Sequence, residues 1–399
     1  MTFARASLAL SCLAFACSDS ATDPPADPDA GGGGNDAAQV GDAGPEDAPS
    51  SRDAGPDATA VGALYTFTGS GDGKIRVYAV DEGTGAWTAK GSIGAGASPS
   101  FLAMDVAKSR LYAVDESGGN VLAFAFDAKA GTLAALGSPV SSQGAGPTHL
   151  SLDPTGKWVL VANYTAGSTA VLPVQADGSL GAATDVKSPG QKAHLAITNP
   201  SGGFAFVPCL GSNIVAQFTL DGVQGKLVAN TPPSVSPPAG AGPRHLAFLT
   251  GEKFAFGINE LQSSVTGYSF DKATGRLAVL QTVSSLPAGF GNANTGAEIA
   301  VHPGGGFVYA SNRGHDSIAT FSVNGATGAL TLVGHEPTGG QTPRSFAVDP
   351  GGKYLFAANQ NSGTVTGFRL DAGSGKPVAL GGAPNTVPSP TFVGAWRLP

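Results

Sequence analysis

Two sets of ionisable residues occupy fixed places in a pattern that recurs along the chain. The first set opens successive copies of the pattern and comprises His194, Arg244, His245, Glu298 and Arg344. The second set follows a short apolar run that ends in Asn in most copies, and comprises Glu260, Arg313 and Gln360. A histidine or a carboxylate can take a proton from water, and guanidiniums can stabilise an oxyanion or hold a substrate carboxylate or phosphate. Together these side chains suit the opening of an anionic ester or lactone by water, without a covalent nucleophile.

The recurring pattern has seven copies between residues 61 and 399. When the copies are aligned on their third residue, they are spaced by 45 to 53 residues. The aligned positions are Phe101, His149, His194, His245, Glu298, Ser345 and Phe392. Repeats of this length, rich in short strands, are typical of β-propeller blades. We therefore predict an all-β protein, a seven-bladed β-propeller.

Each copy has the pattern of four strands joined by tight turns. In one copy an apolar stretch leads to a turn at Asp153-Pro-Thr-Gly-Lys, and strand-like runs begin at Trp158 and Thr169. Pro and Gly favour the turns, and β-branched and aromatic residues favour the strands. The last copy ends at Pro399 soon after its first strand, whereas residues 64–80 are strand-like and precede the first full copy. We predict that the N- and C-terminal strands share one blade and close the ring, which leaves no exposed sheet edge at the seam.

This topology predicts that both sets of ionisable residues meet at one mouth of the central channel. The start of the first strand of a blade and the end of its second strand lie on the same face. There, His194 or Glu260 could act as the general base, and Arg244 and Arg313 could stabilise the oxyanion. The candidate substrate-binding residues are His149, His245, Glu298, Arg344 and Gln360. The alternative is that these polar side chains only satisfy one another in a wet channel, and for His149 a structural role is the alternative.

Several motifs resemble the lactonase family that includes bacterial 6-phosphogluconolactonases and fungal carboxymuconate cyclases. The most telling are Pro243-Arg-His-Leu-Ala-Phe, Ile258-Asn-Glu-Leu and Ser311-Asn-Arg-Gly-His-Asp-Ser-Ile. The resemblance covers about residues 61–399 and is strongest from 243 to 370. It implies a seven-bladed fold and a lactonase that needs no metal and no cofactor.

The resemblance also implies which residues perform the reaction. In the cyclase branch a histidine, two arginines and a glutamate are proposed for catalysis, and they correspond to His194, Arg244, Glu260 and Arg313. The sequence departs from the family near His194. Lys192, Cys209 and Asn213 stand where a second histidine and acidic residues are usual.

The N-terminal part of the chain has a different composition from the repeats. Residues 1–17 have the basic, apolar and small-residue order of a secretory signal, and Cys17 ends a lipobox-like run. Lipidation of Cys17 and plain cleavage are both open. Residues 18–60 contain no aromatic residue and ten acidic residues against one basic residue, so they are expected to form a disordered tether. We predict an exported protein, periplasmic or at the cell surface, lipid-anchored at Cys17.

Other features exclude several classes of function. The basic residues form no cluster that would indicate a nucleic-acid partner, and the sequence contains no Gly-x-Ser-x-Gly elbow, phosphate loop or His/Cys metal motif. Cys209 is expected to be a small buried hydrophobe. His302 and His335 fall in a turn and an outer segment, and His315 with Asp316 is expected to shape a loop, with substrate contact as the alternative. A closed propeller satisfies its own edges, so a monomer is expected.

Two functions remain after these exclusions. The first is an exported hydrolase that opens a sugar or related lactone, with the lactone as its small-molecule partner and any membrane contact through the lipid anchor. The second is a non-catalytic propeller that binds a ligand or protein through the same channel mouth. A metal-dependent gluconolactonase of another propeller family is a third, but the sequence assigns no carboxylate and Asn set to a divalent cation.

Overall fold

The computed structural model describes residues 62–399, which form one compact unit. The predicted signal at 1–17, the lipidation of Cys17 and the tether at 18–60 lie outside the described residues. Among the helices within residues 62–399, none is long and apolar enough to cross a membrane.

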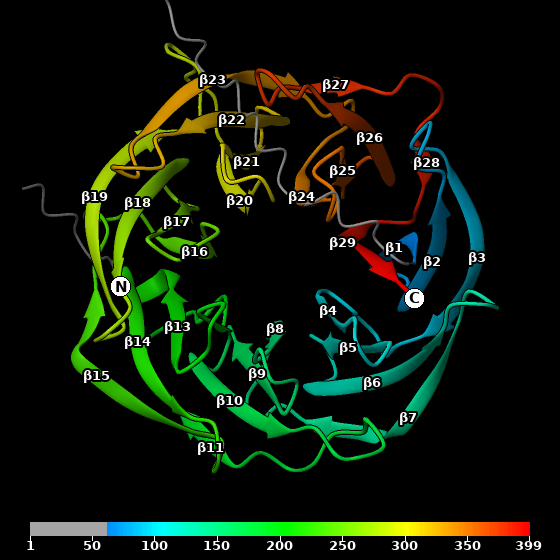
Figure 1. Cartoon of the computed structure of the whole chain (residues 1–399), viewed down its shortest axis with the longest axis vertical. Helices are drawn as coiled ribbons and strands as arrows, with labels where there is room; N and C mark the ends of the chain where they lie inside the picture. The colour runs from blue at the N-terminus through cyan, green and yellow to red at the C-terminus, as the bar shows by residue number, and fades with distance from the viewer. Residues whose placement is uncertain (1–61) are drawn as a thin grey trace, which may run out of the picture. The chain divides into compact units, whose positions relative to one another are not determined.

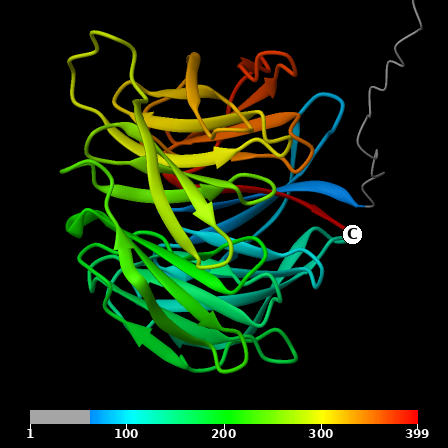
Figure 2. The same cartoon turned by 60° about the vertical axis from the view of Figure 1, so that its left-hand side comes forward.

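Seven β-sheets are arranged as a ring around a central channel (Figures 1 and 2). The first blade contains, from the channel outward, β29 (Pro390–Leu398), β1 (Ala63–Ser70), β2 (Lys74–Val80) and β3 (Trp87–Gly94). The second contains β4 (Leu102–Asp105), β5 (Arg110–Asp115), β6 (Asn120–Asp127) and β7 (Thr132–Ser141). The third contains β8 (Pro147–Leu152), β9 (Trp158–Asn163), β10 (Ser168–Pro173) and β11 (Asp185–Lys187).

The remaining four blades repeat this order. The fourth contains β12 (Ile197–Thr198), β13 (Phe204–Cys209), β14 (Ile214–Asp221) and β15 (Lys226–Val235). The fifth contains β16 (Pro243–Phe248), β17 (Phe254–Asn259), β18 (Ser264–Asp271) and β19 (Arg276–Ser284). The sixth contains β20 (Thr295–Val301), β21 (Phe307–Arg313), β22 (Ser317–Val323) and β23 (Leu330–Pro337). The seventh contains β24 (Pro343–Val348), β25 (Tyr354–Asn359), β26 (Thr364–Leu370) and β27 (Pro377–Ala379), and β28 (Asn385–Thr386) also pairs with β26. The prediction of seven four-stranded blades is confirmed.

The burial of each strand follows its place in the blade. The second strand is covered by neighbouring blades on both faces, so β9, β17 and β25 are buried at every position and their sequences are almost continuously apolar. The outer strand has one face toward solvent, and β7 is mostly exposed or half-buried. The core is therefore a set of apolar layers between adjacent sheets, as expected for stacked blades.

The ring closes where the two ends of the described chain pair. Strand β29 pairs with β1 along its whole length, so the innermost strand of the first blade comes from the C-terminus, as predicted. The Thr391 hydroxyl donates to the carbonyl of Gly69 at 3.1 Å, and Arg397 forms an ion pair with Glu82 at 2.7 Å. A Cβ on Gly69 would lie 2.0 Å from the Pro99 carbonyl oxygen, so only glycine fits at this seam.

The inner strands share an irregularity at the start of the repeat. The pairing register shifts between Pro147 and His149, between Pro243 and His245, and between Pro343 and Ser345. A bulge of this kind adds a residue to one strand and changes the direction of the side chains beside it. In β16 it allows consecutive residues, Arg244 and His245, to contribute to the same end of the channel instead of alternating between faces.

Candidate active site

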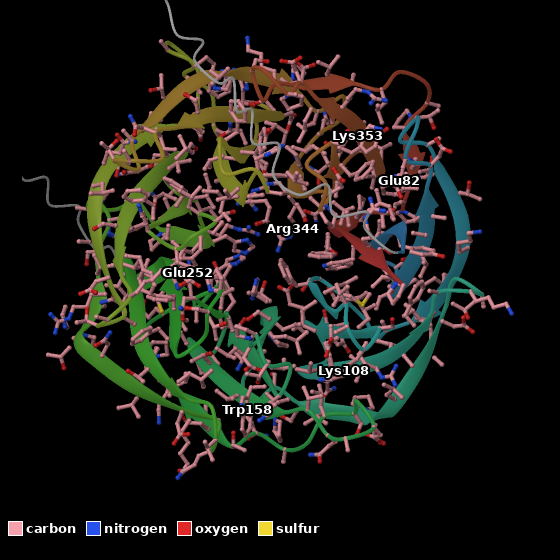
Figure 3. The ribbon with its side chains drawn as sticks, in the orientation of Figure 1. Glu82, Lys108, Trp158, Glu252, Arg344 and Lys353 are labelled. Carbon is pink, nitrogen blue, oxygen red and sulfur yellow. The ribbon has the colours of Figure 1, made fainter. Side chains whose placement is uncertain are left out.

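Ionisable side chains from the fourth, fifth and sixth blades meet at one end of the channel. The mouth cluster, as we call it, comprises His194, Arg244, His245, Glu260, Glu298 and Arg313. The seventh blade adds Arg344, which Figure 3 labels at the central opening. Topology thus brings together residues that the sequence separates by more than a hundred positions, at the face where the strand directions predicted them.

One half of the mouth cluster is a carboxylate held between two guanidiniums. Oε2 of Glu260 lies 3.2 Å from Nε of Arg244 and 3.0 Å from Nη2 of Arg313. Arg244 also donates to the carbonyl of Ala297, and Arg313 donates to that of Gly296 at 3.0 Å. The Nε atoms of both arginines lack an aligned hydrogen-bond partner. The protein therefore positions two cationic forks without using all of their donors.

Burial affects the ionisation of both arginines. Burial, together with the charges of Arg313 and Arg344, lowers the pKa of Arg244 to about 9. Burial also lowers the pKa of Arg313, against the opposing effect of Glu260. Both guanidiniums remain charged at neutral pH, and their shared carboxylate neutralises only part of that charge.

The other half of the mouth cluster is a chain of two imidazoles and a carboxylate. Nδ1 of His194 lies 3.2 Å from Nε2 of His245, and Nδ1 of His245 lies 2.7 Å from Oε1 of Glu298. All three residues are buried, with exposed fractions of 5, 2 and 9%. Burial and the nearby Arg244 lower the pKa of both imidazoles well below the usual value, whereas burial raises the pKa of Glu298 to about 7. Both rings are therefore neutral at neutral pH.

Two of the predicted substrate-binding residues make no hydrogen bond to the mouth cluster, although the ring centroid of His149 lies 5.4 Å from that of His245. His149 is buried against Phe101, with ring centroids 4.0 Å apart, and its Nδ1 accepts the Ala196 N–H at 3.4 Å. Burial lowers the pKa of His149 well below its usual value. The Gln360 side chain is half-buried and makes no hydrogen bond within residues 62–399, although its backbone N–H donates to Thr342. His149 is thus packed beneath the mouth, and Gln360 lies at the end of β25 with its amide unengaged.

The positions that define the mouth also contain Tyr164, which the sequence analysis missed, and Lys192, which it named only as a departure from the family. Tyr164 follows Asn163 just as Glu260 follows Asn259, and its ring lies 5.4 Å from the His194 ring in an edge-to-face arrangement. Lys192 opens its copy of the repeat, and its Nζ lies 5.8 Å from the Tyr164 ring centroid. The same positional rule that selected Glu260 would have selected Tyr164, but its less reactive side chain was not considered.

Below the mouth cluster the channel becomes apolar. A cavity of about 450 Å³ is lined by inner-strand residues, among them Phe101, Met104, Leu152, Phe346 and Trp396. His149 and Glu298 also line it, so they mark the boundary between the polar mouth and the apolar channel. The side chains that could perform acid–base chemistry therefore lie at the mouth, at one end of the channel.

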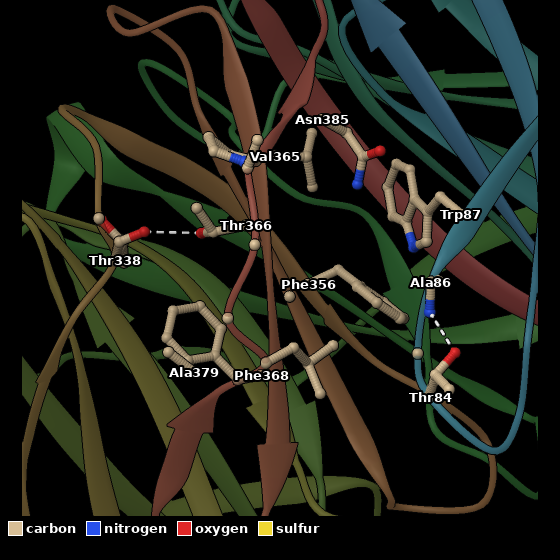
Figure 4. A pocket seen from close by; sticks show the side chains of 18 of the residues that line it. Thr84, Ala86, Trp87, Thr338, Phe356, Val365, Thr366, Phe368, Ala379 and Asn385 are labelled. Atoms are coloured by element: carbon tan, nitrogen blue, oxygen red, sulfur yellow. Dashed lines mark hydrogen bonds between the residues drawn. The ribbon is translucent and has the colours of Figure 1, made fainter.

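A larger cavity of about 610 Å³ lies elsewhere, between the first and seventh blades (Figure 4). It opens beside the short outer strand β27, and its walls include Trp87, Phe356, Val365 and Leu380. No Asp, Glu, Lys, Arg or His lines it. Despite its size, it offers no group for acid–base or oxyanion chemistry, so we place the candidate site at the mouth cluster.

Residues set aside in the sequence occupy structural positions. Cys209 is fully buried, and burial raises the pKa of its thiol to about 12. His315 contacts the Ser317 hydroxyl at 2.7 Å, and the Asp316 carboxylate accepts the Thr342 N–H at 2.8 Å. His302 lies in the turn after β20, and His335 lies on the outer strand β23. Residues 62–399 contain no group of three His, Cys, Asp or Glu side chains placed to bind a metal ion.

Comparison with known proteins relates this geometry to lactonases. The model of a family described as "Lactonase, 7-bladed beta-propeller" matches residues 61–395. A 6-phosphogluconolactonase of Pectobacterium carotovorum is 37% identical over 207 residues, covering 52% of this chain and 62% of the relative. A 6-phosphogluconolactonase of Bacillus subtilis is 36% identical over 238 residues, covering 57% and 67%. The chain thus spans about three fifths to two thirds of the length of these relatives.

A solved structure matches over a longer stretch. The periplasmic gluconolactonase of Pseudomonas aeruginosa superposes with a TM-score of 0.78 and is 31% identical, covering 84% of this chain and all of that one. The similarity therefore covers most of this chain and the whole of the other.

Proposed function

The chain belongs to the family of seven-bladed β-propeller lactonases, and from that premise we propose that it is an exported hydrolase that opens a sugar or related lactone by attack of water. The observation that carries the proposal is the convergence of neutral His194 with the Arg244–Glu260–Arg313 group at one mouth. A proton acceptor and oxyanion-stabilising donors within one cluster are what ester hydrolysis by water requires.

We assign the role of general base to His194. Its imidazole is neutral, and Nε2 has no hydrogen-bond partner within the described residues. Glu260 is the other candidate, but protonation of its carboxylate would weaken two ion pairs, with Arg244 and Arg313. Glu260 therefore serves to hold the two guanidiniums in place.

The reaction then proceeds in two steps. A water O–H bond breaks as its proton forms an N–H bond with Nε2 of His194, and the water oxygen attacks the lactone carbonyl carbon. The guanidiniums of Arg244 and Arg313 stabilise the resulting oxyanion. The ring C–O bond breaks as the carbonyl re-forms, and the leaving oxygen takes the proton from His194. The product is the open hydroxy acid, and the imidazole returns to its neutral form.

The charge of the mouth favours an anionic substrate. The cations Lys192, Arg244, Arg313 and Arg344 outnumber the two carboxylates of the mouth cluster. A phosphate or carboxylate on the lactone would bind these cations, since guanidinium forks match the geometry of both anions. We propose Arg344 as the contact of the bound substrate, with His149 and Gln360 as more distant candidates.

Export of the protein rests on a separate observation. The signal-like residues 1–17 and Cys17 support it, as does the similarity to a periplasmic gluconolactonase. An exported protein would act on lactones outside the cytoplasm, and Cys17 would anchor it to the membrane. Radiolabelled palmitate incorporated by the full chain and lost in Cys17→Ser would support the anchor, whereas a soluble, unlabelled product would indicate plain cleavage.

The test of the activity is hydrolysis of a lactone panel in a pH-stat. The panel contains 6-phosphogluconolactone, gluconolactone and a muconolactone, and the full chain is compared with Glu260→Gln and Arg313→Ala. We expect turnover above the spontaneous rate, with a loss of about 10²–10³-fold in the variants. Glu336→Gln and Arg276→Ala, on outer strands, serve as matched controls. Rates equal to buffer across the panel would indicate a propeller that only binds its ligand at this mouth.

A further inference from the structure

The contact between His245 and Glu298 has a direction that the geometry determines. Oε1 of Glu298 lies 2.7 Å from Nδ1 of His245 and also accepts the backbone N–H of Ile299 at 3.1 Å. A backbone N–H only donates, so this oxygen already acts as an acceptor. With Glu298 ionised, Nδ1 of His245 must therefore carry the proton and donate it to Oε1.

The direction of this hydrogen bond also decides the direction of the next one, between His245 and His194. If Nδ1 of neutral His245 carries its proton, Nε2 has a lone pair and can only accept. Nδ1 of His194, 3.2 Å away, must then be the donor, and Nε2 of His194 is left with the lone pair. The Nη1 of Arg244 lies 3.5 and 3.4 Å from Nδ1 and Nε2 of His245, and because a guanidinium only donates, this contact is compatible with Nε2 as an acceptor.

We propose that Glu298 and His245 are positioning residues that set the tautomer of His194, so that Nε2 faces the reaction as the unprotonated base. The proposal rests on the proposed function for its catalytic meaning. It assigns to Glu298 and His245 a role different from substrate contact, since both act through His194. The Glu298 carboxylate also stabilises the imidazolium that forms when His194 takes a proton. This stabilisation is needed because the nearby Arg244 cation disfavours a second positive charge.

Protonation of Glu298 reverses the direction of both hydrogen bonds, from Glu298 to His245 and from His245 to His194. A protonated carboxyl donates to Nδ1 of His245, so Nε2 of His245 carries the hydrogen and donates to Nδ1 of His194. The hydrogen of His194 then lies on Nε2, and the base is blocked. Burial raises the pKa of Glu298 to about 7, so the reversal falls in the neutral range. The groups that face Glu298 are His245 and Arg244 from β16, Arg344 from β24 and His149 from β8.

The first test reads the tautomer directly and needs no substrate. Two-bond ¹⁵N–¹H spectra of the full chain, with His194 signals assigned by their absence in His194→Gln, report which ring nitrogen carries hydrogen. We expect the Nδ1–H form of His194 at pH 8, conversion to the Nε2–H form by pH 6, and mixed forms at pH 8 in Glu298→Gln, whose amide can donate or accept. One unchanged tautomer in wild type at both pH values would overturn the proposal, and this wild-type titration requires no variant to fold.

The second test measures catalysis. Glu298→Gln is expected to lower kcat about 10–100-fold with KM changed less than about twofold, and to remove the fall of kcat below pH 7. Glu336→Gln on β23 is the matched control and should retain the wild-type profile. A lower kcat with the acidic limb intact would overturn the positioning role. If no lactone is hydrolysed while the tautomer still reverses with pH, the proposed function fails and the hydrogen-bond chain stands.

Discussion

Two arcs of the ring have the same strand topology but carry different side chains. At the third position of the repeat, the third to sixth blades carry His149, His194, His245 and Glu298, whereas the seventh, first and second carry Ser345, Phe392 and Phe101. In the second arc Phe101 and Phe392 pack edge-to-face, with ring centroids 4.6 Å apart. The reactive arc, which is the third to sixth blades, therefore differs from the apolar arc, which is the seventh, first and second blades, in its side chains at this position and not in its strand topology. The fold alone does not determine where chemistry occurs.

The largest effect is expected when the general base is removed from the reactive arc. His194→Gln should lower kcat for lactone hydrolysis by about 10²–10⁴-fold, because general-base catalysis contributes that much. Steady-state kinetics on the best lactone of the panel measures the loss. His302→Gln, in a turn away from the mouth, is the control. A residual rate within a few fold of wild type would mean that the reactive arc uses another base.

A charge buried in the apolar arc should lower the unfolding free energy by nearly as much as loss of the base raises the activation free energy. Phe392 is 5% exposed, so Phe392→Glu would bury a carboxylate without the histidine partner that Glu298 has. We expect the free energy of unfolding to fall by about 3 kcal/mol. Urea unfolding followed by tryptophan fluorescence measures it, with Phe392→Met as the control for lost aromatic packing. Equal stability of the two variants would remove the distinction between the arcs.

The reactive arc should also respond to pH through Glu298. Its pKa rises from the usual 4.5 to about 7 on folding, so its stabilising contribution is present below pH 4.5 and is lost as pH rises through about 7. The unfolding free energy of wild type relative to Glu298→Gln should therefore fall by about 2–3 kcal/mol between pH 4.5 and 8. Urea unfolding of both proteins across this range tests the sign, and parallel curves would contradict it.

The smallest effect concerns a conservative change in the apolar arc. Phe101→Leu removes part of the packing against His149 and Phe392 and should lower the unfolding free energy by about 1 kcal/mol. Because Phe101 touches no reacting group, kcat should stay within about twofold. Urea unfolding and lactone kinetics on the same preparation test both statements. A large loss of kcat with little loss of stability would place the apolar arc within the catalytic machinery.

The sequence predicted the fold because the repeat is read directly from spacing. Seven copies and the strand-like residues 64–80 indicated seven blades and the closure by terminal strands, which β29 and β1 confirm. The convergence at the mouth also followed, since strand direction decides which ends share a face. Both conclusions needed only periodicity and topology.

Side-chain directions could not be predicted in the same way. The register shift beside His245 depends on how two strands pair, and the distances that join His194, His245 and Glu298 depend on that shift. Tyr164 was missed because its type suggested no reaction, although its position was identical to that of Glu260. The catalytic roles of the mouth residues, the signal and the tether remain predictions.

The closing strand has a consequence for the time course of folding. Thr391 and Gly69 are 322 residues apart in the chain, yet they are hydrogen-bonded at the seam. At roughly 5–20 residues per second, a ribosome makes β29 tens of seconds after β1. During that interval β1 has no inner neighbour, and its edge is open to pairing with other chains. Ring closure can therefore occur only after β29 has been made, and any truncation before residue 390 removes the strand that completes the first blade.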